Sequence, residues 1–229
     1  MVKRKEEIEK LRKASEMTDK GFAYICENIK PGMTEKEIAK KLDEYMFSLG
    51  ATGLAFDTIV GSGPNSSMIH SVPTDRKIEE QDIILFDIGY VFDEYCSDMS
   101  RTIFVGGITE KQKMIYDLVL KTQLNAIENI RVGMKANEAD MLGRRFILDS
   151  GFDYPHALGH GIGKVVHEDL VLSPKRENVL EENDLKDGYG EENDDSEEDE
   201  DSDELFSSLD DEGEDMLYED NMENYEDDE

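Results

Sequence analysis

Two segments of this chain, 101 residues apart, share both their residues and their surroundings. Residues 27–33 are Glu-Asn-Ile-Lys-Pro-Gly-Met, and residues 128–134 are Glu-Asn-Ile-Arg-Val-Gly-Met. At the same offset Gly50 corresponds to Gly151, and each copy has the pattern of a helix, a Gly-Met turn, a helix and a glycine. Several matches in one register indicate an internal duplication. We therefore expect an α+β fold of two halves related by a pseudo-twofold axis.

The apolar pattern predicts where the helices and strands lie. Apolar residues recur at spacings of three and four over residues 5–30 and 111–129, which predicts two amphipathic helices. Thr34 followed by Glu37 is a capping box, so a further helix should begin there and end near Leu49. The mostly apolar run from Ile83 to Gly89 favours a buried strand over an alternating one. Further strands are expected at residues 56–60, 95–98 and 102–105, with a turn at residues 61–65.

Charge is spread unevenly along the chain. Residues 177–229 hold 28 of the 56 acidic residues and one basic residue, Lys186, whereas residues 1–176 hold 28 acidic and 24 basic residues. So acidic a segment buries too little apolar surface to offset the entropy cost of ordering it. We expect residues 1–176 to form the folded domain and residues 177–229 a disordered acidic tail. A net-negative chain repels phosphate, which disfavours a nucleic-acid partner.

Cysteine content and hydropathy indicate the compartment. The two cysteines, Cys26 and Cys96, cannot form a disulfide framework, and no Cys-x-x-Cys pair is present for zinc. We find neither a signal-peptide pattern nor an apolar run near the ~20 residues that a membrane helix needs. The sequence thus predicts a cytoplasmic protein with no membrane partner.

Two aspartates and a group of histidines form the candidate site. Asp87 ends an apolar strand, where a carboxylate is costly unless it is paired or bound to a metal. Asp98 follows closely enough for a short hairpin to bring the two carboxylates together. Three of the four histidines are grouped along the chain: His156, His160 and His167. Two carboxylates and an imidazole suit manganese, cobalt, iron or zinc.

Each of these residues also has an ordinary structural explanation. A buried aspartate such as Asp98 is usually hydrogen-bonded to backbone amides, and His156 and His167 also suit half-buried polar positions. The combination of Asp87, Asp98 and His160 favours the metal site, because no structural role requires all three together.

Ordered motifs connect these residues to a known family. Along the chain these motifs are residues 61–66, His70, residues 84–89, residues 95–102 and residues 158–163. In this order they resemble the pita-bread metallopeptidases, which include methionine aminopeptidase, aminopeptidase P and prolidase. The resemblance covers residues 5–174, and the pair His167-Glu168 is closest to the Xaa-Pro branch.

The resemblance implies a pita-bread (creatinase/aminopeptidase) fold and two divalent metal ions, manganese, cobalt, zinc or iron. It implies that Asp87 is a bidentate ligand of one ion, Asp98 bridges both ions, and His160 binds the other. It assigns catalytic roles on the substrate side to three histidines: His70, His156 and His167. The implied reaction is hydrolysis, through a metal-bound hydroxide, of the first peptide bond of a peptide with a free N-terminus. A homodimer is one expected assembly.

The family has two further ligands, both glutamates, on strands that would follow Glu182. Neither a Thr-Ile-Glu-Pro-Gly-type nor an Arg-Ile-Glu-Asp-type segment occurs in the sequence, and the acidic tail stands in their place. We therefore expect an incomplete second half. Two functions stay open. One is a metal-dependent Xaa-Pro aminopeptidase whose activity the missing ligands reduce or abolish. The alternative is an inactive peptidase-like protein whose acidic tail binds basic proteins.

Overall fold

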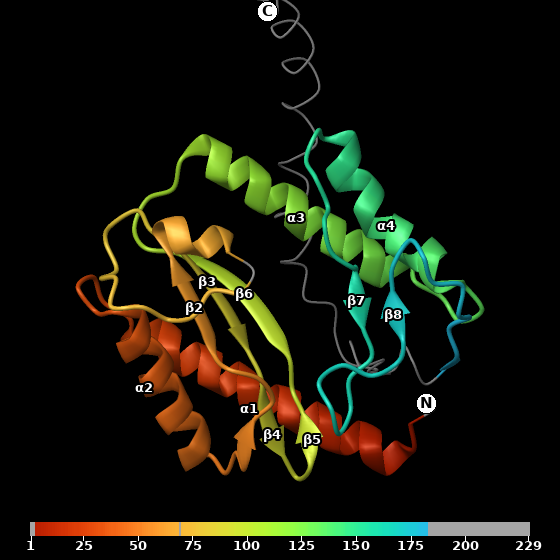
Figure 1. Cartoon of the computed structure of the whole chain (residues 1–229), viewed down its shortest axis with the longest axis horizontal. Helices are drawn as coiled ribbons and strands as arrows, with labels where there is room; N and C mark the ends of the chain where they lie inside the picture. Colours follow the sequence, from red (N-terminus) through yellow and green to blue (C-terminus); the bar gives the residue numbers. More distant parts are fainter. Residues whose placement is uncertain (1–2, 69, 183–229) are drawn as a thin grey trace, which may run out of the picture. The chain divides into compact units, whose positions relative to one another are not determined.

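The computed structural model describes residues 3–68 and 70–182. The first half contains α1 (Lys5–Asn28), α2 (Glu35–Ser48), β1 (Gly53–Leu54), β2 (Ile59–Ser62), the 3-10 helix η1 (Gly63–Ser67), β3 (Ile83–Ile88), β4 (Tyr90–Phe92), β5 (Tyr95–Cys96) and β6 (Met99–Phe104) (Figure 1). The second half contains α3 (Glu110–Asn129), α4 (Ala136–Asp149), β7 (Gly159–His160) and β8 (Val171–Leu172). Most of the predicted acidic tail, residues 183–229, lies outside the described residues.

The predicted capping box begins α2. Thr34 Oγ1 accepts a hydrogen bond from Glu37 N at 3.1 Å, and Glu37 Oε2 accepts one from Thr34 N at 2.8 Å. The same reciprocal pair, made by Thr109 and Gln112, begins α3. These bonds satisfy backbone N–H groups that have no partner within the first helical turn. The prediction of a helix start at Thr34 is confirmed.

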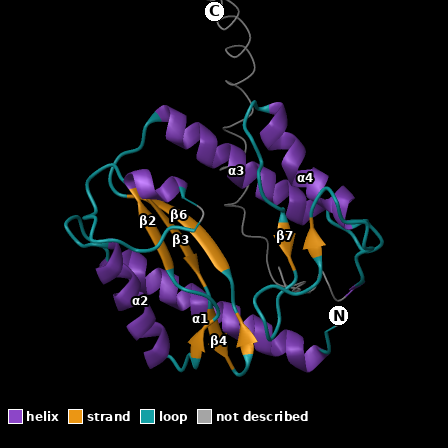
Figure 2. Ribbon diagram, viewed as in Figure 1, coloured by secondary structure: helices purple, strands orange, loops and turns teal. Residues whose placement is uncertain are grey.

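All the strands in the described residues pair antiparallel. They form the three-stranded sheets β2-β3-β6 and β1-β4-β5 and the two-stranded ladder β7-β8 (Figure 2). Helix α2 packs against β2, while α1 packs against α2, β4 and β5. Helices α3 and α4 pack against each other, and β8 contacts α4. In the part of the chain that the structure describes, no helix has the length and apolar character to cross a membrane.

Strand β3 alternates in burial, which corrects the expectation of a strand buried on both faces. Ile84, Phe86 and Ile88 are fully buried in the core, whereas the intervening positions, Asp87 among them, are half-buried. The reason is that Asp87 faces a pocket rather than the core. The neighbouring strand β2 also lies later than expected, at Ile59–Ser62, and η1 occupies most of the predicted turn.

The backbone confirms the internal repeat. Gly32 and Gly133, each after the first helix of its half, have φ angles of +92° and +87°. Gly32 N donates to Ile78 O at 2.8 Å, and Gly133 N donates to Leu180 O at 2.9 Å. Both halves therefore close the helix-turn-helix unit against a later strand-like segment through the same backbone bonds.

The buried faces of the second helices also correspond. In α2 the buried residues are Glu35, Ile38, Ala39, Leu42 and Met46, and in α4 they are Ala136, Ala139, Asp140, Gly143 and Ile147. Each member of one set lies at the repeat offset from a member of the other. The side chains differ while the positions coincide, so the duplication preserves the packing face rather than the residues on it.

The folded part extends beyond residue 176, the boundary expected from composition. Asn137 N donates to Arg176 O, Ala136 N donates to Asn178 O, and Leu180 is only 1% exposed. Acidic composition begins at residue 177, but Val179 and Leu180 complete the second copy of the turn. Sequence composition averages over these two residues and so misses the backbone bridge between Val179 and Lys135 and the burial of Leu180.

We predict that Gly32→Ala and Gly133→Ala lower the free energy of unfolding by similar amounts, about 1–2 kcal/mol each. A Cβ at either position would meet no atom within 4 Å, so the cost arises from the left-handed backbone alone. Urea denaturation measures it. Gly107→Ala is the matched control, because its Cβ also meets nothing and its φ is not in the left-handed region. A negligible effect at Gly133 with a full effect at Gly32 would contradict structural equivalence of the two turns.

Candidate functional site

The register of β3 and β6 positions both aspartates. Asp87 lies opposite Ser100 on β6 and opposite Ile59 on β2, and Ile88 lies opposite Met99. Asp98 immediately precedes Met99, so the antiparallel pairing brings it close to the end of β3. The hairpin predicted between the two aspartates is thus formed, through β4 and β5. Ser100 Oγ donates a hydrogen bond of 2.9 Å to Asp87 Oδ1.

The second half contributes His160, on β7. Its Nε2 lies 3.3 Å from Asp98 Oδ2, and the two side chains are 27% and 22% exposed. The other ring nitrogen, Nδ1, lies 3.1 Å from Gly161 O. A carboxylate from one half and an imidazole from the other therefore meet in a partly desolvated contact.

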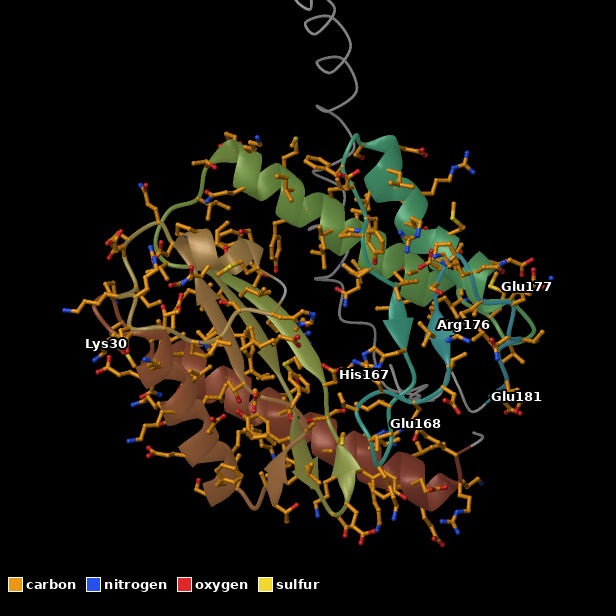
Figure 3. All side chains as sticks on the ribbon, viewed as in Figure 1. Lys30, His167, Glu168, Arg176, Glu177 and Glu181 are labelled. Atoms are coloured by element: carbon orange, nitrogen blue, oxygen red, sulfur yellow. The ribbon has the colours of Figure 1, made fainter. Side chains whose placement is uncertain are left out.

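His167 lies on the connection between β7 and β8 and stacks obliquely on His160, with ring centroids 4.2 Å apart. Figure 3 shows His167 beside Glu168 on this connection. Several contacts with the first half hold the connection in place: Cys96 N donates to Gly163 O at 2.8 Å, Lys3 pairs with Glu168 at 3.3 Å, and Lys164 pairs with Glu94 at 2.8 Å. The position of His167 thus depends on contacts between the halves.

These residues surround one pocket of about 530 Å³, a size that suits a small ligand. Five of the predicted site residues line it: His70, Asp87, Asp98, His160 and His167. Its remaining lining combines apolar and polar side chains: Phe56, Asp57, Thr58, Ile59, Ser71, Val72, Pro73 and Ser100. Residues far apart in the sequence thus meet at one concave surface.

The sixth predicted residue, His156, does not line this pocket. It is exposed, its ring lies 4.7 Å from the Tyr154 ring, and its Nδ1 lies 2.7 Å from Ala157 O. The backbone beside it is held by Arg144, which donates to His156 O and pairs with the fully buried Asp140. The predicted substrate-side role of His156 stays a prediction.

Sequence reasoning missed several pocket residues. Asp57 and Thr58 were expected only as part of a strand, yet both line the pocket. Thr58 donates to Asp43 at 2.7 Å, and Asp43 also accepts from Tyr90 at 2.8 Å. Helix α2, which contains Asp43, therefore helps to fix the side of the pocket that Thr58 lines. The sequence does show an Asp-Thr pair beside an apolar strand, which can indicate a site. Nothing in the sequence shows that this pair lies near Asp87 in the fold.

Asp87 and His160 have pKa values above their ordinary values. Burial raises the pKa of Asp87, and the negative charge of Asp98 raises it further. The hydrogen bond that His160 Nε2 donates to Asp98 raises the pKa of His160. The charge of Asp98 thus contributes to both shifts, and a bound cation would counter that negative charge.

Two of the three predicted ligands have a separation that suits one metal ion. Ligand atoms ~2.0–2.2 Å from an ion lie about 3.0–3.4 Å from each other, and Asp98 Oδ2 and His160 Nε2 are 3.3 Å apart. Among the described residues, no group of three or more His, Cys, Asp or Glu side chains is arranged to hold an ion. Asp87 shares the pocket, and two carboxylates with an imidazole fit a divalent transition metal in donor chemistry.

Comparison with known proteins identifies the family. The profile of metallopeptidase family M24 matches residues 9–185. The chain is 42% identical over 184 residues to the Xaa-Pro dipeptidase of Pyrococcus furiosus, covering 80% of this chain and 53% of that protein.

Solved structures agree. Prolidase from Pyrococcus furiosus matches with a TM-score of 0.78 at 41% identity, over 80% of this chain and 55% of that one. The X-Pro aminopeptidase from Thermotoga maritima matches with a TM-score of 0.77 at 38% identity, over 80% and 53%. The chain thus spans about half the length of these relatives, and the predicted pita-bread fold and Xaa-Pro branch are confirmed. This protein belongs to metallopeptidase family M24.

Proposed function

We propose that this chain contains the pocket of a metal-dependent Xaa-Pro aminopeptidase, which hydrolyses the first peptide bond of peptides with a free N-terminus. The observation that carries the proposal is the meeting of Asp98 and His160, from opposite halves of the repeat, beside Asp87 in one pocket. Residues 1–176, with the turn that contains Val179 and Leu180, would form the catalytic domain. We also propose that the protein is located in the cytoplasm.

In this proposal Asp87, Asp98 and His160 hold divalent metal ions, manganese or cobalt among the candidates. Bound metal ions supply Lewis acidity and lower the pKa of a coordinated water, which provides a nucleophile near neutral pH. The two carboxylates neutralise the ionic charge, and their mutual repulsion favours occupation of the site. The family resemblance implies two more glutamate ligands, on segments that the sequence does not contain. The proposal therefore depends on the three ligands named here and implies a lower activity than a complete site would have.

The remaining pocket residues would bind and orient the peptide. His70 and His167 line the pocket and can donate hydrogen bonds to the carbonyl oxygen as negative charge develops on it. Phe56, Ile59, Val72 and Pro73 provide an apolar surface against which a proline ring can pack. The pocket's negative charge would attract the free amine of the substrate.

The alternative is an inactive peptidase-like protein that binds basic proteins. It is supported by composition, since residues 177–229 hold 28 acidic residues and one basic residue. Attraction to a basic partner would weaken as salt screens the charges. Metal binding and turnover separate the two functions.

We predict that the purified chain hydrolyses an Ala-Pro dipeptide with added Mn²⁺ or Co²⁺, and that Asp98→Asn lowers kcat/KM at least 100-fold. Loss of a supporting group next to a metal ligand already costs ~10–100-fold, and loss of a ligand should cost more. Asp153→Asn is the matched control, because Asp153 is exposed and outside the pocket lining. Calorimetric titration of the metal accompanies the assay. Metal binding without turnover by the wild type would contradict the enzyme and favour the binding protein.

We also predict that, without added metal, His160 titrates above its ordinary pKa of 6.5, and that Asp98→Asn lowers its pKa. Asp98 stabilises the charged imidazole, so the folded pKa exceeds the unfolded one. The contact's contribution to stability is therefore complete below about pH 6.5 and is lost as pH rises through the raised pKa. NMR of the histidine Cε1–H signals, with His160→Gln for assignment, measures this. An unchanged pKa in Asp98→Asn would show that the contact does not form in solution.

A further inference from the structure

Glu35 is a fully buried carboxylate that the proposed reaction does not use. It is the first residue of α2 and 0% exposed. Its Oε1 accepts from Ser62 N and Ser62 Oγ, both at 2.7 Å, and from Asn65 Nδ2 at 3.0 Å. Its Oε2 accepts from Thr74 N at 2.9 Å and Thr74 Oγ1 at 2.6 Å. Burial alone would raise the pKa of Glu35, but the bonds from Thr74 and Ser62 outweigh it and leave the pKa below its usual value.

The donors lie on both sides of a pocket wall, the segment of residues 70–73. Ser62 ends β2 and Asn65 lies in η1, before the wall, whereas Thr74 directly follows it. All four residues of the wall line the pocket, and His70 is one of them. One carboxylate therefore ties together the two chain segments from which the wall extends.

The second half of the repeat shows that the backbone does not require this carboxylate. The residue equivalent to Glu35 is Ala136, also 0% exposed. Ala136 N donates to Asn178 O at 2.8 Å, as Glu35 N donates to Arg76 O at 3.2 Å. The junction between helix and strand-like segment thus forms around an alanine with the same backbone hydrogen bond.

The two halves differ in how the corresponding segment is held. In the second half, β7 and β8 pair with each other, with Gly159 opposite Leu172 and His160 opposite Val171. The wall has no ladder of its own: residues 70–73 belong to no strand, and the described backbone bonds nearest to them join Ser71 N to Met68 O and Lys36 N to Thr74 O. The second half also contains a buried carboxylate, Asp140, but it accepts from Leu158 N just before β7, and no described hydrogen bond joins it to β8.

We propose that Glu35 is a positioning residue, which fixes the pocket wall and thereby the place of His70 opposite the two aspartates. Glu35 replaces, through hydrogen bonds from five donor groups, the strand pairing that orders the equivalent segment of the second half. This role rests on the proposed function, because His70 has a task only if the pocket binds a peptide.

Glu35→Gln and Glu35→Ala in the full chain test the role. Glutamine keeps the shape but turns an amide NH₂ toward N–H or O–H donors, so at least one side of the clamp fails. We expect the His70 Cε1–H signal to move or broaden in both variants. The kcat for Ala-Pro should fall about 100-fold, the loss typical of a displacement near 1 Å. The Mn²⁺ dissociation constant should stay within about threefold of wild type, because Glu35 is not a proposed ligand. With four histidines in the chain, His70→Gln identifies the signal.

Met46→Ala is the matched control, since Met46 is fully buried in the core and makes no polar contact with the wall. It should lower Tm while leaving the His70 signal and kcat unchanged. Should Glu35→Ala fail to fold, Thr74→Val removes a single hydroxyl donor and keeps the carboxylate. Its expected result is a smaller shift of the same His70 signal.

Glu35 variants that lose stability but keep the wild-type His70 signal would overturn the proposal and leave Glu35 a purely structural residue. The NMR comparison needs neither metal nor turnover. If the wild type hydrolyses no dipeptide, the proposed function fails, and the His70 signal still decides whether Glu35 fixes the wall.

Discussion

The proximity of Asp87 and Asp98 is the constraint on which the pocket depends. Burial and the neighbouring charge both raise the pKa of Asp87, so the pair is costly to hold in a metal-free protein. The antiparallel register of β3 and β6 keeps the carboxylates together despite this cost, and Ser100 and His160 offset part of it. A divalent cation would offset the rest, which is why a pocket of this kind suits a metallopeptidase better than a neutral binding cleft.

The repeat builds one scaffold twice and then gives each copy different polar supports. Both halves have the helix-turn-helix unit with its left-handed glycine, and both bury the same face of the second helix. The first half uses Glu35 to hold the segment beside β2, and the second uses Asp140 with Arg144 and the β7-β8 ladder. The scaffold common to both halves thus provides rigidity. The polar groups that differ between the halves position His70 and His160 at the same pocket.

Patterns that span many residues predicted the fold well. The helical periodicity, the Thr34 capping box and the duplicated Gly-Met turn all correspond to observed elements. The two-residue strands β1, β7 and β8 are too short to produce a pattern, whereas β5 lies within the strand predicted at residues 95–98. Strand β3 is expected from sequence to be buried on both faces because Ile83 and Leu85, on its half-buried face, are also apolar. In the site, Asp87, Asp98 and His160 were predictable from residue type and motif order. Glu35 was not, because its donors come from two segments of the chain that lie far from it in the sequence and that only folding brings to it.

The central claim is that Asp87, Asp98 and His160 form one cation site in this chain. Anomalous diffraction from crystals of the full protein grown with Mn²⁺ tests it most directly, because manganese is located without reference to activity. The account predicts a manganese peak bounded by these three side chains, and its loss in Asp98→Asn. Two results would contradict this prediction. One is manganese bound only at other places on the protein, and the other is an Asp98–His160 contact unchanged in these crystals with no manganese in the pocket.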